Sequence, residues 1–172
     1  MDDAYAVQNA IYKAKLTAGQ KVIGWKIGLT SKAMQYALNI DIPDSGILFD
    51  DMLFETGATV SKGRFIQPRI EAEIAFVMKS TIGGADVNRA DVIAATDYVA
   101  PSIEILDTRI LRTDPVTGQT RNVCDTISDN AAMRALFWVQ NGMRSMRSIC
   151  VGWVRWHSAT MKSRKQVWVP VY

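Results

Sequence analysis

The sequence predicts an α+β fold, with many short strands in one mixed sheet and a few flanking helices. Helical periodicity of apolar residues is confined to a few stretches, whereas short runs of branched apolar residues between turns recur along residues 21–106. The regular strand–helix alternation of a doubly wound sheet is absent from the sequence. Neither a Gly-x-Gly-x-x-Gly motif nor a Walker loop supports nucleotide binding.

The first elements follow from local patterns. A helix is expected over residues 2–18, because apolar residues recur there at i, i+3, i+4 and i+7 before a glycine. Residues 21–29 read as an apolar strand. Thr30 or Ser31 then caps a short helix through Leu38.

The remaining elements are less regular. They are expected as a turn over 42–46, an apolar run from 47, short strands near 58–60 and 64–66, a strand from 68, a loop through 83–84, a helix over 89–95, a strand from 101 and a turn over 114–118.

Three carboxylates carry most of the functional information. Glu71 and Glu73 lie two residues apart in one expected strand, so their side chains point to the same face. Glu104 lies in a similar apolar frame in the strand from Pro101. Acids on a buried face repel each other and are costly to desolvate, and a bound divalent cation removes both costs. Hard oxygen ligands favour Mg²⁺ or Mn²⁺. The alternative is a half-exposed strand with solvated Glu side chains.

Lys26, Asp44 and Arg69 are further candidates. Lys26, mid-strand between apolar neighbours, is either a solvent-facing lysine or a partly desolvated ammonium that donates to an anionic substrate oxygen or transfers a proton. Asp44 is either a turn residue or a carboxylate base held by a rigid turn. Arg69 can pair with a substrate carboxylate or with a neighbouring acid.

Five strings occur in an order typical of one family. They are Gly24-Trp25-Lys26-Ile27-Gly28-Leu29-Thr30-Ser31-Lys32, Pro43-Asp44-Ser45-Gly46, Pro68-Arg69-Ile70-Glu71-Ala72-Glu73, Pro101-Ser102-Ile103-Glu104 and Asp125-Thr126-Ile127-Ser128-Asp129-Asn130-Ala131. Residues 3–132 therefore resemble the hydratase and decarboxylase branch of the fumarylacetoacetate hydrolase superfamily. The resemblance implies the mixed β-roll of the C-terminal-domain type in that superfamily, incomplete in this chain, and assembly into homo-oligomers.

The resemblance also implies roles for individual residues. Glu71, Glu73 and Glu104 match the ligands of Mg²⁺ or Mn²⁺, Lys26 and Asp44 match residues of proton transfer and water activation, and Arg69 and Leu29 are the expected substrate-binding residues. The implied reaction is metal-assisted addition of water to a 2-oxo-enoate dicarboxylate. The expected substrate is 2-oxohept-3-ene-1,7-dioate and the product 4-hydroxy-2-oxoheptane-1,7-dioate, in homoprotocatechuate breakdown. Alternatives on this scaffold are hydration of 2-oxopent-4-enoate, decarboxylation of 4-oxalocrotonate, isomerisation and C–C hydrolysis.

Composition changes abruptly after residue 132. Residues 1–132 hold 13 Lys and Arg and all 17 Asp and Glu, whereas residues 133–172 hold seven Lys and Arg, no acid, the only His and four of the five Trp. We therefore expect a partial hydratase-like catalytic domain over 1–132 and a basic, Trp-rich tail over 133–172 without family resemblance. Each Trp-Val pair of the tail gives a Gly codon when it is read one base earlier, and shifted strings resemble the family. This pattern favours an out-of-frame tail.

Further expectations follow from this division. The first residues resemble an internal helix of the family, so the chain is expected to be truncated at both ends. An incomplete roll leaves strand edges and apolar faces uncovered, and we therefore expect poor folding and no hydratase activity. The alternative to an enzyme is a nucleic-acid-binding module that uses the basic tail. Between the two we favour the enzyme, and we therefore expect no nucleic-acid partner.

The sequence also limits the cellular compartments in which the protein is expected. It contains no run of 18 apolar residues and no charged-then-apolar leader, so neither a membrane span nor a secretory signal is expected. Cys124 and Cys150 lack metal-ligand spacing, and a cytoplasmic protein with reduced thiols is the default expectation.

Overall fold

The structure is a computed structural model, and it describes residues 1–37, 39–40, 43–138 and 166–170. The predicted helix end at Leu38, the start of the predicted turn at Ile42 and most of the basic tail lie outside the described residues.

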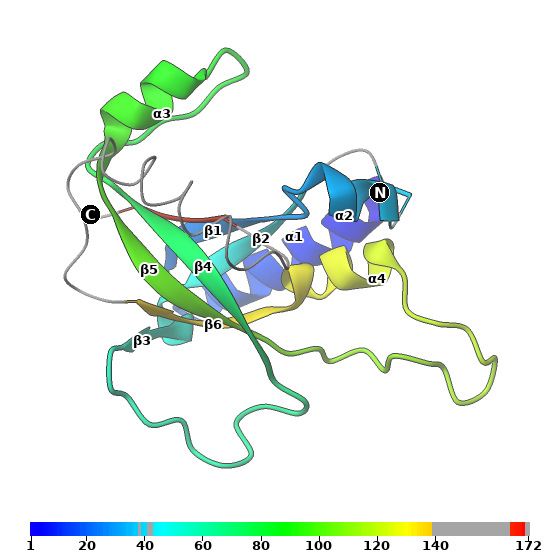
Figure 1. The fold of residues 1–172 in the computed structure, drawn as a ribbon. Coiled ribbons are helices and arrows are strands. Elements are labelled where there is room, and N and C mark those ends of the chain that lie inside the picture. The colour runs from blue at the N-terminus through cyan, green and yellow to red at the C-terminus, as the bar shows by residue number, and fades with distance from the viewer. Residues whose placement is uncertain (38, 41–42, 139–165, 171–172) are drawn as a thin grey trace.

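One mixed sheet forms the centre of the described structure (Figure 1). Its strands are β1 (Val22–Gly28), β2 (Asp44–Phe49), β3 (Leu53–Glu55), β4 (Arg69–Met78), β5 (Thr96–Leu106), β6 (Met133–Trp138) and β7 (Gln166–Pro170). They lie in the order β2-β1-β7-β4-β5-β6-β3. The pairs β4–β7 and β3–β6 are parallel, and the other neighbouring pairs are antiparallel. This mixed sheet agrees with the predicted α+β class.

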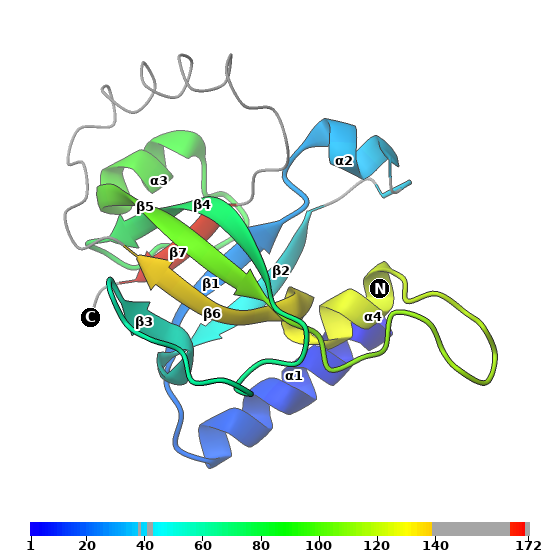
Figure 2. The same ribbon diagram turned by 60° about the horizontal axis from the view of Figure 1, so that its bottom comes forward.

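The helices lie around this sheet. They are α1 (Asp2–Thr17), α2 (Lys32–Ala37), α3 (Arg89–Ala95) and α4 (Val123–Ser128), with single 3-10 turns at η1 (Asp50–Met52) and η2 (Asn130–Ala132). Figures 1 and 2 show α1 beside α4, and α3 beyond one end of the long β4–β5 hairpin. The buried Gln8 of α1 joins this helix to β2 and α4, because its amide donates to the carbonyls of Ser45 (2.8 Å) and Ile127 (3.1 Å).

Several predicted elements are confirmed by local chemistry. α1 ends one residue before its predicted end, and α3 has the predicted bounds, with Asn88 as a capping-box residue at its start. The predicted turn over 114–118 is also present. The backbone N–H groups of Val116 and then Thr117 donate to Asp114 and hold the pKa of its carboxyl below the usual value.

Other predictions were wrong. Residues 58–60 and 64–66 form no strand. The second of these stretches leads instead into a loop whose Ile66 and Gln67 amides donate to the buried carboxylate of Asp107 (2.9 and 2.8 Å). The strand β3 was not predicted. It forms beside β6, where Phe54 stacks on Phe137 with ring centroids 4.9 Å apart.

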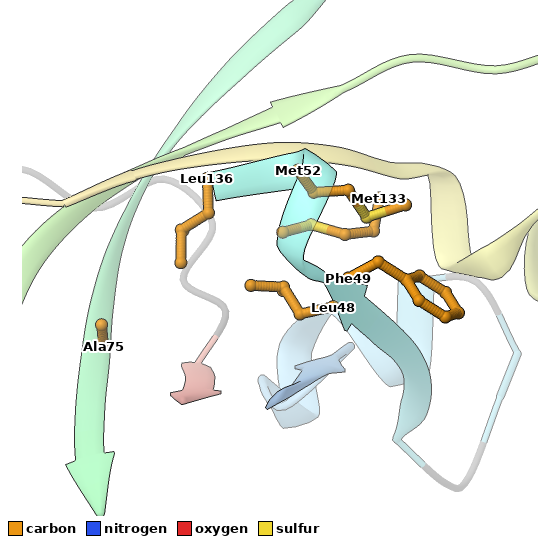
Figure 3. Packing of buried hydrophobic residues seen from close by; sticks show 6 residues of the cluster. All are labelled: Leu48, Phe49, Met52, Ala75, Met133 and Leu136. Carbon is orange, nitrogen blue, oxygen red and sulfur yellow. The ribbon is translucent and has the colours of Figure 1, made fainter. Parts of the chain in front are cut away.

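The apolar core lies between β2, η1, β4 and β6 (Figure 3). Its buried members are Leu48, Phe49, Met52, Ala75, Met133 and Leu136. Met133 and Leu136 belong to β6, which follows the composition change at residue 132 and pairs with β5. Among the described residues, no helix is long and apolar enough to cross a membrane.

Candidate active site

The hairpin of β4 and β5 brings the three predicted carboxylates together. Glu71 lies directly opposite Glu104 in the antiparallel register, and Glu73 lies opposite Ser102. Residues two apart in a strand share a face, so all three Glu side chains point to one side of the hairpin. One ligand oxygen from each lies within 4.8 Å of the others. Glu73 and Glu104 are buried and Glu71 is half-buried.

This cluster fits a divalent cation. Three carboxylates in a buried setting form a hard-oxygen ligand set, and a dication offsets their mutual repulsion. With Mg–O distances near 2.0–2.1 Å, two ligand oxygens can be no more than about 4.2 Å apart. The three ligand oxygens, all within 4.8 Å of one another, lie close to that limit. The arrangement can therefore bind a divalent metal ion.

Lys26 is fully buried beside this cluster, which excludes the alternative of a solvent-facing strand lysine. Its Nζ donates to Glu104 Oε1 and to the carbonyl oxygen of Ala131, both at 2.6 Å. Burial of an ammonium is costly unless it is paired and hydrogen-bonded, and these two acceptors supply both conditions. A carboxylate has two oxygens, so Glu104 can accept from Lys26 with one and coordinate a cation with the other.

Asp44 is the first residue of β2. The sequence pattern predicts a turn at this position, and that prediction was wrong. It pairs in register with Gly28 of β1 and is 5% exposed. Its Oδ1 is buried, with no hydrogen-bond partner among the residues that the structure describes. Gly28 makes room for this carboxylate, because a Cβ at position 28 would lie 1.9 Å from Oδ1.

Replacing Gly28 with Ala should therefore displace the Asp44 side chain. We expect the substitution to lower the free energy of unfolding by about 1–3 kcal/mol, the usual cost of inserting a methyl group into packed space. Urea titration of the purified chain measures this change. Gly83→Ala is the matched control, because a Cβ there meets nothing within 4 Å. Equal stability of the two variants would contradict the close approach of Asp44 to Gly28.

The two predicted substrate-binding residues lie at the ends of strands. Arg69 begins β4, is exposed, and shares the strand face of Glu71. Leu29 follows β1 in a left-handed backbone conformation (φ 55°), and its carbonyl accepts from Gln35 Nε2 at 2.6 Å. Substrate contact by either residue stays a prediction.

Sequence reasoning missed two features of the site. Ser102 lies opposite Glu73, and its buried hydroxyl has no hydrogen-bond partner in the described part of the chain. Its position two residues before Glu104 could have placed it on the carboxylate face. The turn that presents the Ala131 carbonyl to Lys26 gave no local signal, because its backbone conformation is held by distant residues.

Comparison with known proteins gives a consistent set of relatives. The chain is 49% identical over 132 residues to the 2-oxo-hept-4-ene-1,7-dioate hydratase of Escherichia coli, which covers 77% of this chain and 49% of that protein. It is 44% identical over 133 residues to the 2-keto-4-pentenoate hydratase 1 of Dechloromonas aromatica, which covers 76% of this chain and 48% of that protein. No family model matches the sequence. The chain thus spans about half the length of the curated relatives it matches.

Solved structures that resemble this chain include a related decarboxylase. A 4-oxalocrotonate decarboxylase from Pseudomonas putida G7, complexed with magnesium and adipate, superimposes with a TM-score of 0.74 at 33% identity, over 86% of this chain and 53% of that one. A structure of the same decarboxylase with calcium and acetate superimposes with a TM-score of 0.73 at 33% identity, over 86% of this chain and 52% of that one.

Proposed function

Because this chain belongs to the hydratase and decarboxylase branch of the fumarylacetoacetate hydrolase superfamily, we propose that its site serves the metal-dependent addition of water to a 2-oxo-enoate. The observation that carries the proposal is the convergence of Glu71, Glu73 and Glu104 beside the buried ammonium of Lys26. On this proposal the sheet is part of the β-roll of that superfamily.

The proposed residue roles follow from charge and burial. Glu71, Glu73 and Glu104 would hold Mg²⁺ or Mn²⁺, which when bound supplies a Lewis acid for a 2-oxo acid. Lys26 places a fixed positive charge beside the same carboxylates, where it would stabilise negative charge that develops on the substrate. Asp44, with one buried carboxylate oxygen, would accept a proton from the attacking water.

The proposed substrate class is a 2-oxo-enoate dicarboxylate. The Escherichia coli relative is named for the 4-ene isomer of 2-oxoheptene-1,7-dioate, whereas the sequence had suggested the 3-ene isomer. In the 3-ene the double bond is conjugated with the 2-oxo group, so water adds at C4. In the 4-ene a proton shift must first bring the double bond into conjugation. The second candidate is decarboxylation of 4-oxalocrotonate, favoured by the likeness to the decarboxylase structure.

The composition of residues 133–172 leads to a second proposal, about the reading frame of the gene. We infer that they are read out of frame, because acidic residues are absent from them and four of the five Trp gather there. The chain would then consist of a catalytic part over 1–132 and an out-of-frame tail, whose first residues, Met133–Trp138, still pair with β5 as strand β6. The coding sequence after codon 132 tests this proposal directly. A reading frame one base earlier that lacks a family-like extension would contradict it.

The assay compares two purified proteins, the 172-residue chain and a chain with that frame restored. Each protein is mixed with Mg²⁺ and either the 3-ene or the 4-ene isomer of 2-oxoheptene-1,7-dioate. The products are identified by mass spectrometry. We expect the restored chain to form the water adduct, the 172-residue chain to form little, and Asp44→Asn in the restored chain to lower turnover by about 100-fold or more. Release of CO₂ from 4-oxalocrotonate would favour the decarboxylase candidate. No turnover by either protein on any of these substrates would contradict both.

A further inference from the structure

The turn Asn130–Ala132 has an unusual backbone. Its three residues have φ values of 57°, 52° and 59°, and none of them is glycine. Left-handed backbone is unfavourable for residues with a Cβ, and it persists only where the surroundings hold it in place. Such strain gathers at functional sites, so the contacts that maintain this turn indicate what it does.

The Asn130 side chain attaches the turn to β2. Its Oδ1 accepts from the backbone N–H of Ile47 at 2.7 Å, and its Nδ2 donates to the carbonyl of Ile47 at 2.8 Å. Asn130 is buried, so both polar atoms depend on this pair of hydrogen bonds. On the far side of the turn, the carbonyl of Ala132 accepts from the backbone N–H of Asp107 at 3.0 Å.

The residue before the turn is fixed as well. The backbone N–H of Arg109 donates to Asp129 Oδ2 at 2.7 Å, its guanidinium Nε donates to Oδ1, and its Nη2 donates to the Asp129 carbonyl at 3.0 Å. Both ends of the turn are therefore held by residues outside it.

The turn delivers one carbonyl to the candidate site. The Ala131 oxygen accepts from Lys26 Nζ at 2.6 Å, on the same ammonium that donates to Glu104. Gly46, which pairs with Lys26 in the β1–β2 register, lets the turn approach closely. A Cβ at position 46 would lie 2.7 Å from the Asn130 carbonyl oxygen and 3.3 Å from Ala131 Cβ.

We propose that Asn130 is a positioning residue, which clamps the left-handed turn to β2 so that the Ala131 carbonyl holds the Lys26 ammonium against Glu104. A lysine ammonium sits on a flexible four-carbon stem, and a second acceptor from another element removes that freedom. The catalytic consequence rests on the proposed hydratase function. The placement of the ammonium does not, since it can be measured without substrate or metal.

The test uses two variants that disturb the turn from opposite sides. Asn130→Gly removes the clamp but tolerates left-handed backbone, and Gly46→Ala pushes the turn while leaving Asn130 intact. Asn88→Ala is the matched control, because it removes an asparagine that caps α3, with hydrogen bonds to Ala90 and Asp91. All three variants are expected to melt at lower temperature than the unmodified chain.

The measurement is proton exchange of lysine ammonium groups in ¹H–¹⁵N NMR spectra of the full, metal-free chain, with the Lys26 signal assigned by its loss in Lys26→Met. We expect a protected Lys26 signal in the unmodified chain and in Asn88→Ala. In Asn130→Gly and Gly46→Ala its exchange should become about tenfold faster or the signal should vanish, as expected for loss of a hydrogen bond to a charged group. In the frame-restored chain, Asn130→Gly should also lower kcat about tenfold with little change in KM.

Two results would overturn the inference. One is the absence of a protected Lys26 signal in the unmodified chain. The other is an exchange rate in both turn variants equal to that in Asn88→Ala, which would make the turn a stabilising element only. If the signal responds as expected but no 2-oxo-enoate is hydrated, the positioning role of Asn130 stands and the proposed function fails.

Discussion

Replacing Lys26 with Met lowers the free energy of unfolding of the metal-free chain by about 3–5 kcal/mol, the usual cost of leaving a buried charge without its partner. Glu104 is fully buried and accepts from Lys26 at 2.6 Å, and Glu71 and Glu73 crowd the same space. Met fills the volume of the lysine stem, so the loss reports charge and not packing. Urea unfolding without divalent ions measures it, with the exposed Lys62→Met as control.

Two further measurements test the interaction between Lys26 and Glu104. Saturating Mg²⁺ should stabilise Lys26→Met more than the unmodified chain, because an ion that binds only the folded state adds stability and is no longer repelled by a neighbouring ammonium. The double variant Lys26→Met/Glu104→Gln should be more stable than Lys26→Met alone, since replacing both members of a buried ion pair is often nearly neutral. Additive losses in this cycle would contradict the coupling of the two side chains.

Replacing Glu73 with Gln weakens Mn²⁺ binding by at least about 100-fold, the upper end of what loss of an outer-shell partner costs at metal sites. The metal-free variant should be as stable as the unmodified chain or more stable, because one of three neighbouring negative charges is gone. Glu73 is the informative choice, since Glu104 also accepts from Lys26. Calorimetric titration with Mn²⁺ measures the affinity.

Glu55→Gln is the matched control for this substitution. Glu55 is an exposed acid at the end of β3, outside the cluster of three carboxylates. Its variant should bind Mn²⁺ as the unmodified chain does. If Glu73→Gln and Glu55→Gln bound the ion equally well, the divalent cation would lie elsewhere.

The parts of the site that could be predicted from sequence depend on local geometry. The alternation of side chains along a strand places Glu71 and Glu73 on one face whatever the rest of the fold does. The apolar frame of Glu104 marked a second strand, and the hairpin register then set it opposite Glu71. The helix α3 has the bounds expected from the sequence, and the structure adds the capping box of Asn88 at its start.

What could not be predicted depends on partners far away in the chain. Asp44 looked like a turn residue, and only its pairing with Gly28 shows why a strand begins there. Asn130 clamps Ile47 across 83 residues of sequence, and no local pattern specifies three consecutive left-handed residues. The burial of Lys26 likewise depends on Glu104 and Ala131, which lie on other elements.

Crystals of the full chain soaked in MnCl₂ give the most direct test of the metal site, through the anomalous scattering of manganese. We predict a single strong anomalous peak with one oxygen each from Glu71, Glu73 and Glu104 within about 2.2 Å. A peak bonded to other acids, or three carboxylates turned away from an empty centre, would contradict the shared site on which the proposed hydratase function depends.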